Sequence, residues 1–524
     1  MKRRNFLQAA TILPFFSRPL FEKTGPQPPD TRLPEIRETM AGDAGKRDFF
    51  YKPADAWAAD FIPLYADGEF HLFFLLDWRD SEKHGEGTPW YRISTKDFVH
   101  FTEHGEMLPR GTTEEQDLYV FTGSAISAHE NINAQGKYHI FYTGHNPHLL
   151  DQGKPQEGIM HAVSEDMKQW KKLPGQTFFA PDDRYERNDW RDPFVFWNEE
   201  SREYNMLVAA RFKKGIPRRR GLTALCASKD LEKWEVREPF YAPDLYYTHE
   251  CPDLFRMGDW WYLLFSEFTD LVRTRYRMSR SLKGPWIIPK RDDFDGHAYY
   301  AAKTASDGNK RFLFGWNPTR DGAKDSGDWN WGGNLVVHEI YQENNGELSV
   351  KVPETVKAAF GNIVAQDFRP GAGSVQAENG ILKIKSPGTF EAAAAGKMPS
   401  TCRINATVEF EKETKECGLM LRVSDDLETA YYIRLEPRNN KLVFDKWPRD
   451  RSEVSQMVEL DRDIALIPGV PYHFQVFIEN TKGVAYLNDK IAMNFRIYDL
   501  PEGNWGVFVS QGAATFKNMT VSTL

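Results

Sequence analysis

Cysteine is scarce in this sequence. Its 524 residues include four cysteines, none of them in a Cys-x-x-Cys pair: Cys226, Cys251, Cys402 and Cys417. Four scattered thiols are too few for a disulfide framework, and unpaired cysteines give no sign of a zinc site. We therefore expect buried free thiols, and the alternative is a bridge between Cys402 and Cys417.

Basic clusters and long apolar runs are missing as well. The chain carries 67 basic and 75 acidic residues, a net charge of −8, and its one basic block beyond the amino terminus is Arg218-Arg219-Arg220. This balance argues against a nucleic-acid partner. No later segment has the about 18 consecutive apolar residues that a membrane span requires. We expect a protein without a membrane span.

Aromatic residues are abundant instead. The sequence is 41% hydrophobic and 14% aromatic. A chain of 524 residues is too long for one ordinary core, so we expect two domains. The high content of Trp, Tyr and Phe favours β-structure and a surface on which sugar rings stack.

The amino terminus has features of an export signal. Met1-Lys2-Arg3-Arg4-Asn5-Phe6-Leu7-Gln8 precedes a short, weakly apolar run that ends near Phe16. Arg-Arg-x-Phe-Leu resembles a twin-arginine signal and predicts a periplasmic or secreted protein; the alternative is a disordered basic tail. No cysteine follows, which excludes a lipoprotein anchor. We interpret residues 1–46 as export signal and linker.

One pattern recurs five times in residues 47–353. Each copy is a turn, then an aromatic residue and an apolar strand, and the copies are Gly68–Phe74, Gly136–Tyr142, Arg202–Val208, Asp259–Phe265 and Asn309–Gly315. They start roughly 50 to 70 residues apart, which is too long for single hairpins and fits four-stranded antiparallel sheets with insertions. The pattern predicts an all-β fold with a five-bladed β-propeller.

A second motif follows the same spacing and indicates a turn. In each copy a Ser and an Asp are placed to bond backbone amides, and an aromatic residue follows to pack between sheets. The copies are Ser94–Phe98, Ser164–Met167 and Ser228–Leu231, with a degenerate copy at Ser281–Trp286. We therefore assign Asp97, Asp166 and Asp230 to turns rather than to catalysis.

Three other acids stand outside these repeats. Asp60, Asp192 and Glu250 each lie about a dozen residues before equivalent positions of three recurring strands. If the preceding strand is the innermost of each blade, three carboxylates meet at one mouth of the central channel, and at least one pKa should rise. The alternative, that each acid caps a turn beside a proline, explains any one of them but not their common spacing.

Longer motifs surround these acids. Phe121-Thr122-Gly123-Ser124, Trp190-Arg191-Asp192-Pro193 and His249-Glu250-Cys251-Pro252-Asp253 occur in this order, and Trp90 precedes the first Ser-Thr-Lys-Asp turn. Together they resemble the Arg-Asp-Pro, Glu-Cys and Phe-Ser-Gly-Ser segments of glycoside hydrolase family 32, the invertase, inulinase and levanase family. The resemblance runs from about Phe49 to Pro353 and continues into an appended β-sandwich.

One motif departs from that family. Ala59-Asp60-Phe61-Ile62-Pro63 stands where the family has Asn-Asp-Pro-Asn-Gly, so the acid is kept while its polar neighbours and the glycine are lost. Hydrogen bonds to sugar hydroxyls from a buried site decide substrate choice. The departure leaves the sugar preference open.

The resemblance implies a retaining double displacement without a metal or organic cofactor. Asp60 would attack the anomeric carbon of a terminal furanoside, and Glu250 would protonate the leaving oxygen and then activate water, with the two carboxyl groups roughly 5–5.5 Å apart. Asp192, paired with Arg191, would hold two ring hydroxyls. A raised pKa is required of Glu250, and we expect it from an aromatic wall that includes Tyr246 and Tyr247.

Further residues are expected to contact an oligo- or polysaccharide substrate. Ser124 and Arg191 belong to the motifs, and aromatic residues supply an apolar rim for stacking. The candidate rim residues are Trp57, Trp78, Trp90, Phe121, Trp316 and Trp331.

The residue pattern changes in residues 354–524 and predicts a β-sandwich. Alternating apolar and polar residues recur in segments such as Arg403–Phe410, Gly418–Val423, Tyr431–Leu435 and Tyr472–Ile478. No acid cluster with catalytic spacing occurs there. Three functions stay open: a β-fructosidase acting on fructans or sucrose, a furanosidase of arabinofuranosidase-like specificity, and a noncatalytic glycan-binding propeller.

Overall fold

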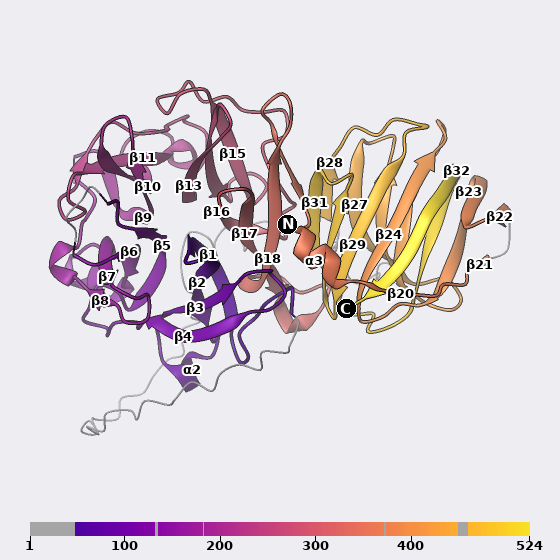
Figure 1. Cartoon of the computed structure of the whole chain (residues 1–524), viewed down its shortest axis with the longest axis horizontal. Helices are drawn as coiled ribbons and strands as arrows, with labels where there is room; N and C mark the ends of the chain where they lie inside the picture. The colour runs from indigo at the N-terminus through magenta and orange to yellow at the C-terminus, as the bar shows by residue number, and fades with distance from the viewer. Residues whose placement is uncertain (1–47, 131–134, 182, 371–373, 449–459) are drawn as a thin grey trace.

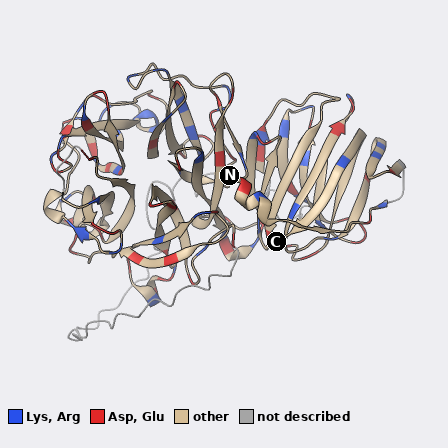
Figure 2. Cartoon of the chain, in the orientation of Figure 1, with Lys and Arg blue, Asp and Glu red and all other residues tan. Residues whose placement is uncertain are grey.

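The computed structural model describes residues 48–130, 135–181, 183–370, 374–448 and 460–524, which form two β domains side by side (Figure 1). The predicted export signal and linker, residues 1–46, lie outside the described residues. Within them, no helix is both long and apolar enough to cross a membrane. Acidic and basic residues are interspersed along the ribbons of both domains (Figure 2).

The amino-terminal domain is the predicted five-bladed β-propeller. Its strands follow the chain blade by blade: β1 (Trp57–Ala66), β2 (Glu69–Asp77), β3 (Trp90–Thr95) and β4 (Thr102–Leu108); β5 (Tyr119–Ser127), β6 (Tyr138–His145), β7 (Glu157–Ser164) and β8 (Lys171–Lys172); β9 (Tyr185–Asn198), β10 (Glu203–Phe212), β11 (Gly221–Ser228) and β12 (Glu235–Val236); β13 (Glu250–Met257), β14 (Trp260–Glu267) and β15 (Arg273–Ser279); β16 (Tyr300–Ser306), β17 (Arg311–Arg320), β18 (Trp329–Gln342) and β19 (Leu348–Lys351).

Blade four has three strands rather than the four expected, and an isolated bridge between Met278 and Ile287 takes the place of the outer strand. Short helical segments lie in the connections: α2 (Ser81–His84), η1 (Pro147–Gln152), η2 (Pro174–Gln176), η3 (Pro217–Arg219) and η4 (Asp321–Ala323).

The five recurring segments fall on the second strand of each blade, β2, β6, β10, β14 and β17. These strands are buried on both faces because each blade packs between two neighbours, so they appear as apolar runs rather than alternating ones. The first strands, β1, β5, β9, β13 and β16, contact one another in turn around the ring. The prediction that the strand before each recurring segment is the innermost one is therefore confirmed.

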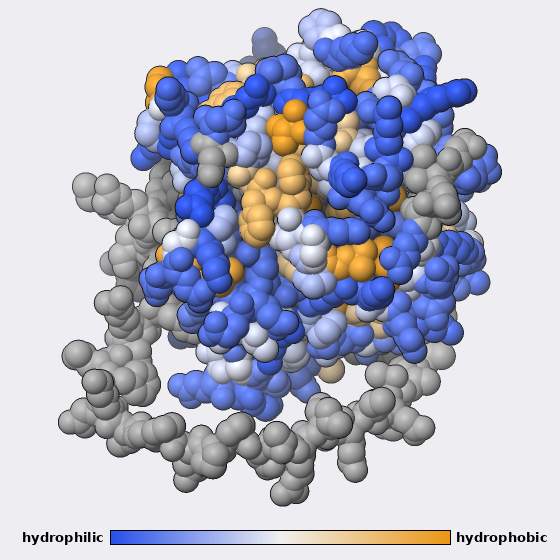
Figure 3. All heavy atoms as spheres, turned by 90° about the vertical axis from the view of Figure 1, so that its left-hand side faces the viewer, coloured by the Kyte–Doolittle hydropathy of each residue, from blue (hydrophilic) through white to orange (hydrophobic). Residues whose placement is uncertain are grey.

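The ring closes between the first and last blades. Strand β18 pairs with β1 through Ala58 and Gly333, which joins blades five and one in one sheet. A side chain at Gly333 would overlap the carbonyl oxygen of Asn317, so this close approach requires glycine. The face of the propeller turned away from the sandwich is mainly hydrophilic (Figure 3).

The repeated turn motif is confirmed with one shift. Ser164 and Ser228 accept the amides of Met167 and Leu231 at 2.9 Å each, and Asp166 and Asp230 accept the amides that follow. In the first copy the hydroxyl is that of Thr95 rather than Ser94, and it accepts the amide of Phe98 at 2.9 Å. These aspartates therefore close turns, as predicted.

The carboxy-terminal domain is the predicted β-sandwich, preceded by α3 (Glu354–Ala359). Strand β32 pairs with β25 through Ser510 and with β24 through Val521, so one long strand runs from one layer into the other. The strands are β20 (Asn362–Val364), β21 (Arg369–Pro370), β22 (Ser374–Glu378), β23 (Ile381–Lys397), β24 (Thr401–Phe410), β25 (Glu416–Val423), β26 (Ala430–Glu436), β27 (Lys441–Trp447), β28 (Leu460–Asp463), β29 (Tyr472–Glu479), β30 (Lys482–Leu487), β31 (Ile491–Arg496) and β32 (Asn504–Thr523).

The two domains share a core and buried polar contacts. Phe477 and Tyr486 of the sandwich belong to the same apolar cluster as blades one and five. Arg496 donates to the carbonyl oxygens of Pro318 (2.9 Å) and Asn317 (2.7 Å), and Arg462 donates to Asp293 at 2.6 Å. Because these buried hydrogen bonds and the shared apolar cluster cross the boundary, the sandwich packs directly against the propeller.

All four cysteines are buried and free. The expected buried thiols are confirmed, and the alternative bridge between Cys402 and Cys417 is wrong. Cys402 lies in β24 and Cys417 lies in β25. Strand β32 runs between these two strands and pairs with each of them along a different part of its length.

Candidate active site

The pairing of the innermost strand with its neighbour is irregular in all five blades, and in blades one, three, four and five the irregularity coincides with an unusual backbone conformation. In these four blades the register of the first strand shifts where one residue has a positive φ: Asp60 (45°), Asp192 (56°), Cys251 (51°) and Ala301 (52°). Non-glycine residues rarely adopt this conformation, and bulges re-aim side chains next to active sites. The repeated bulge therefore marks one structural level of the propeller.

We predicted that the three acids occupy equivalent positions, and the bulge shows that Glu250 does not. Asp60 and Asp192 occupy the same bulge position in blades one and three, whereas Glu250 comes one residue before the bulge at Cys251. The equivalents of Glu250 are thus Arg191 and Tyr300. In the sequence, the distance from each acid to the next strand varies by one residue. That distance therefore cannot distinguish the bulge residue from the residue before it.

The three carboxylates nonetheless form one site. Asp192 accepts the backbone N–H of Cys251 at 2.9 Å, directly after Glu250. The negative charge of Asp192 raises the pKa of both Asp60 and Glu250, although burial contributes more to each shift. Trp316 donates to Asp60 and its cross-strand partner Tyr300 donates to Glu250, so the carboxyl groups lie near one another at the centre of the ring.

Asp60 is held through both carboxylate oxygens. Thr122 Oγ1 donates to Oδ2 at 2.5 Å, and Trp316 Nε1 donates to Oδ1 at 2.9 Å. Burial raises the pKa of Asp60 to about 6, while these hydrogen bonds oppose the rise. Asp60 is therefore mainly ionised at neutral pH and fixed in orientation, as a nucleophile requires.

Glu250 has the opposite protonation. Its Oε2 accepts from the Tyr300 hydroxyl at 2.7 Å, and its Oε1 from Arg191 Nη2 at 3.1 Å. Burial raises the pKa of Glu250 to about 8, against the positive charge of Arg191. At neutral pH Glu250 is therefore mainly protonated and able to donate, as a general acid must.

The two tyrosines named for the expected aromatic wall pack against other side chains. Tyr246 packs on Phe265, at 6.0 Å between ring centroids, and the ring of Tyr247 lies 3.5 Å from the Arg211 guanidinium. Tyr300 is the tyrosine whose hydroxyl contacts Glu250. Burial raises the pKa of Glu250 as expected, while the hydrogen bond from Tyr300 opposes the rise.

Arg191 does not pair with Asp192 as expected. Successive side chains of a strand point to opposite faces, and the ion pairs of Arg191 among the described residues are with Asp189 (2.6 Å), Glu250 (3.1 Å) and Glu157 (3.7 Å). Burial disfavours the charged guanidinium, but these acids raise the pKa of Arg191 above its usual range. Arg191 thus stays a cation beside Glu250.

Asp192 is held instead by two hydrogen bonds in which a backbone N–H is the donor. Its own N–H donates to Thr143 Oγ1 at 2.8 Å, and its carboxylate accepts from Cys251. Burial raises the pKa of Asp192, while the charges of Arg191 and Lys303 oppose the rise. Lys303 is itself buried and donates to the carbonyl oxygen of Pro252 at 3.2 Å.

Three of the proposed substrate contacts are packed inside the propeller. Trp90 is fully buried and donates to the carbonyl oxygen of Val120 at 3.0 Å. Phe121 stacks on His145 at 4.5 Å. The Ser124 hydroxyl accepts the amide of Val195 at 3.0 Å, which joins blades two and three.

The four remaining aromatic candidates differ in their contacts. Trp316 is buried and donates a hydrogen bond to Asp60. The ring centroids of Trp331 and Trp316 lie 6.3 Å apart. The ring of Trp57 is covered by Arg79 at 4.8 Å, and Trp78 stacks on His84 at 5.0 Å. Among the described contacts, Trp316 is therefore the member of this set that bonds a site carboxylate.

Sequence reasoning missed Thr122, Thr143, Tyr300 and Lys303. Thr122 lay within the quoted Phe-Thr-Gly-Ser motif, so its place in the order of motifs was a usable signal. Tyr300 and Lys303 flank the blade-five bulge, but no acid marks that bulge in the sequence. No local pattern distinguishes Thr143. Among the described residues, no group of three or more His, Cys, Asp or Glu side chains has the arrangement of a metal site.

Two buried carboxyl groups with raised and separated pKa values, about 6 for Asp60 and about 8 for Glu250, suit the chemistry of glycoside hydrolysis. The family model "Glycosyl hydrolases family 32 N-terminal domain" matches residues 51–349. The chain therefore belongs to glycosyl hydrolase family 32, as the motifs predicted, and it is a glycosidase.

Similar proteins cover both domains. The chain is 22% identical over 498 residues to a levanbiose-producing levanase of Bacillus subtilis (strain 168), covering 90% of each chain. It is 25% identical over 496 residues to a sucrose-6-phosphate hydrolase of Escherichia coli, covering 90% of this chain and 93% of that protein. Fructan 1-exohydrolase IIa of Cichorium intybus has the same fold, with a TM-score of 0.69 at 16% identity over 91% of this chain and 97% of that one.

Proposed function

We propose that this family 32 glycosidase removes terminal β-fructosyl units from fructans or sucrose by double displacement with retention of configuration. The observation that carries the mechanism is the placement of two buried carboxyl groups, Asp60 and Glu250, which accept hydrogen bonds from the cross-strand partners Trp316 and Tyr300. Burial raises their pKa values to about 6 and about 8, which favours Asp60 as the nucleophile and Glu250 as the acid. The fructoside class is supported by the names of the relatives, a levanase and a sucrose-6-phosphate hydrolase.

In the first step the Asp60 carboxylate attacks the anomeric carbon, and the bond from that carbon to the leaving oxygen breaks. The proton of Glu250 moves to the leaving oxygen, so the leaving group departs as a neutral alcohol. Glu250 becomes negative at this moment. Arg191 and Tyr300, which already contact its two oxygens, stabilise that charge without rearrangement.

In the second step Glu250 takes a proton from water, and the oxygen of that water attacks the anomeric carbon. The ester bond to Asp60 breaks, the sugar leaves, and both carboxyl groups return to their initial protonation states. Two inversions at one carbon give net retention. We assign to Asp192 the role of accepting hydrogen bonds from the hydroxyls of the sugar ring. Its carboxylate is buried beside both reacting groups and is held by the Cys251 amide.

A furanosidase of different specificity is the second candidate. It is favoured by Ala59, which is fully buried directly before Asp60 and offers no side-chain hydrogen bond where the family motif has Asn. A site that lacks one hydroxyl partner discriminates less against sugars without that hydroxyl.

A substrate panel tests both candidates. Purified protein is incubated with sucrose, inulin, levan and an aryl α-arabinofuranoside, with Asp60→Asn and Glu250→Gln as controls. Release of fructose from at least one fructoside, lost in both controls, supports the proposed function. Release of arabinose alone favours the second candidate, and binding without any release favours a noncatalytic propeller.

We also propose that the protein is exported through the twin-arginine route. The support is the Arg3-Arg4-x-Phe-Leu sequence. Fractionation of cells that express the chain with Arg3→Lys and Arg4→Lys tests it: the double variant should stay inside the cytoplasmic membrane while the parent crosses it.

A further inference from the structure

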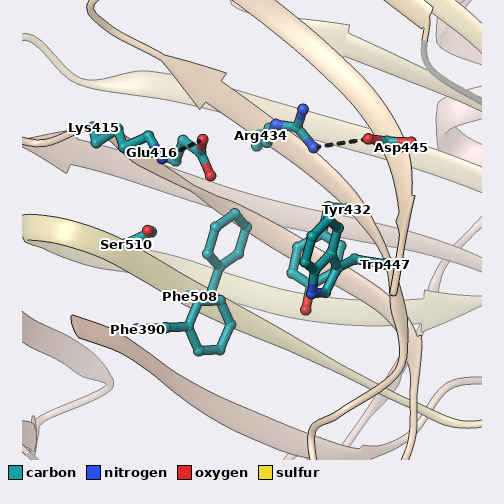
Figure 4. A pocket seen from close by; sticks show the side chains of 9 residues that line it. All are labelled: Phe390, Lys415, Glu416, Tyr432, Arg434, Asp445, Trp447, Phe508 and Ser510. Atoms are coloured by element: carbon teal, nitrogen blue, oxygen red, sulfur yellow. Dashed lines mark hydrogen bonds and ion pairs between the residues drawn. The ribbon is translucent and has the colours of Figure 1, made fainter. Parts of the chain in front are cut away.

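A pocket of about 380 Å³ opens on one face of the sandwich, away from the three carboxylates. It crosses adjacent strands β23, β26, β27 and β32 and the start of β25 (Figure 4). Its lining residues are Phe390, Lys415, Glu416, Tyr432, Arg434, Asp445, Trp447, Phe508 and Ser510. The volume is at the small end of the about 300–1,000 Å³ typical of small-molecule sites, which suits a short segment rather than a folded partner.

One side of this sandwich pocket is aromatic. Phe390 and Phe508 stack at 5.6 Å with an interplanar angle of 20°, and Tyr432 meets Phe508 edge-on at 5.0 Å. Trp447 is 56% exposed and Phe390 is 45% exposed. Large aromatic rings are left exposed together at binding sites more often than elsewhere, because their exposure is otherwise unfavourable.

The other side is polar and close to neutral. Figure 4 shows Lys415, Glu416, Arg434 and Asp445 in a row facing the rings. Arg434 is held by Glu436 at 2.8 Å and Asp445 at 3.4 Å, and Lys415 lies 3.6 Å from Glu416. Two cations and two anions line the pocket, so neither an anionic nor a cationic ligand is favoured. Rigid donors and acceptors beside aromatic rings suit a neutral polyol.

We propose that this sandwich pocket is a second carbohydrate site, which binds a segment of the fructan that the propeller hydrolyses. The inference rests on the proposed function for the identity of the sugar. The apolar C–H face of a fructosyl unit stacks on Trp447 or Phe390, and its hydroxyls bond Arg434, Glu416 and Ser510. Because buried hydrogen bonds join the two domains, binding here raises the concentration of chain ends near Asp60.

Retention in native gels that contain polysaccharide tests the site. The full chain carrying Glu250→Gln, which slows hydrolysis, is run in levan, inulin and arabinan gels, with and without Trp447→Ala. Arg434→Gln serves as a second, independent pocket variant. Phe179→Ala is the matched control, since Phe179 is an exposed aromatic residue of the propeller, 38% exposed and outside the pocket.

We expect Trp447→Ala and Arg434→Gln each to weaken retention in levan or inulin at least five-fold, while Phe179→Ala matches the parent. In the otherwise wild-type chain, Trp447→Ala should raise KM for the polymer and leave sucrose kinetics unchanged. Equal retention of parent and pocket variants overturns the inference. A pocket variant that alters the solution mass instead of retention also overturns it, since the pocket is then a protein contact.

The two proposals fail in distinguishable ways. If no fructoside is cleaved by the wild-type chain but retention still depends on Trp447, the proposed function is wrong and the second site stands. If fructosides are cleaved and retention does not depend on Trp447, the second site is wrong alone.

Discussion

Tyr300 and Trp316 are cross-strand partners in blade five, and each donates a hydrogen bond to a different reacting carboxyl group. Their ring centroids lie 5.7 Å apart. Tyr300 bonds Glu250 of blade four, and Trp316 bonds Asp60 of blade one. The register of β16 and β17 therefore sets the relative positions of proton donor and nucleophile, although blade five carries neither.

Tyr300→Phe should shift the basic limb of the pH profile to higher pH. The tyrosine hydroxyl lowers the pKa of Glu250, since it stabilises the carboxylate, so its removal raises that pKa further. Turnover should fall about ten-fold, because Glu250 loses a donor when it becomes negative. Profiles of kcat/KM against pH measure both effects. Tyr299→Phe is the control, because Tyr299 donates to the Leu313 carbonyl oxygen instead.

The wild-type profile should be bell-shaped. Activity requires ionised Asp60 and protonated Glu250, whose pKa values are about 6 and about 8. Activity should thus rise as pH increases through about 6 and fall as pH increases through about 8. A profile that stays flat from pH 5 to 9 would contradict the assignment of both groups.

Glu250→Gln should stabilise the fold at alkaline pH. The folded pKa of about 8 lies above the ordinary glutamate value of 4.5, so the folded state binds the proton more tightly than the unfolded state. Wild-type stability therefore decreases as pH rises from about 4.5 to about 8, whereas the glutamine variant lacks this loss. The difference in unfolding free energy should grow over this window to a few kcal/mol. Denaturant unfolding at pH 5 and pH 9 measures it, and an equal difference at both values would refute the shift.

Ser124→Ala should reduce stability rather than substrate affinity. The hydroxyl accepts the buried Val195 amide, and an unsatisfied buried donor costs about 1–3 kcal/mol. KM and kcat should stay within two-fold of wild type. A large increase in KM at unchanged stability would instead assign Ser124 to the substrate, as its motif first indicated.

The fold was predictable because it repeats. The aromatic and apolar segments of β2, β6, β10, β14 and β17 gave the number of blades, and alternation gave the sandwich. The missing fourth strand of blade four was not visible, since an isolated bridge at Ile287 leaves no periodic signal.

The sequence predicted the three acids of the candidate site but not the residues that contact them. Asp60, Asp192 and Glu250 stood out because they broke the repeat while keeping its spacing. The one-residue offset of Glu250 depends on a positive φ at Cys251, which sequence spacing cannot resolve. Tyr300, Thr143 and Lys303 reach the site through long-range packing, so no local pattern marks them.

A covalent adduct on Asp60 tests the account most directly. The Glu250→Ala variant is incubated with β-fructosyl fluoride, whose leaving group needs no proton, and the digested protein is mapped by mass spectrometry. The account predicts one fructosyl unit on the peptide that contains Asp60 and none after Asp60→Asn is added. An adduct on another residue, or turnover of the fluoride with inversion and no adduct, would contradict it.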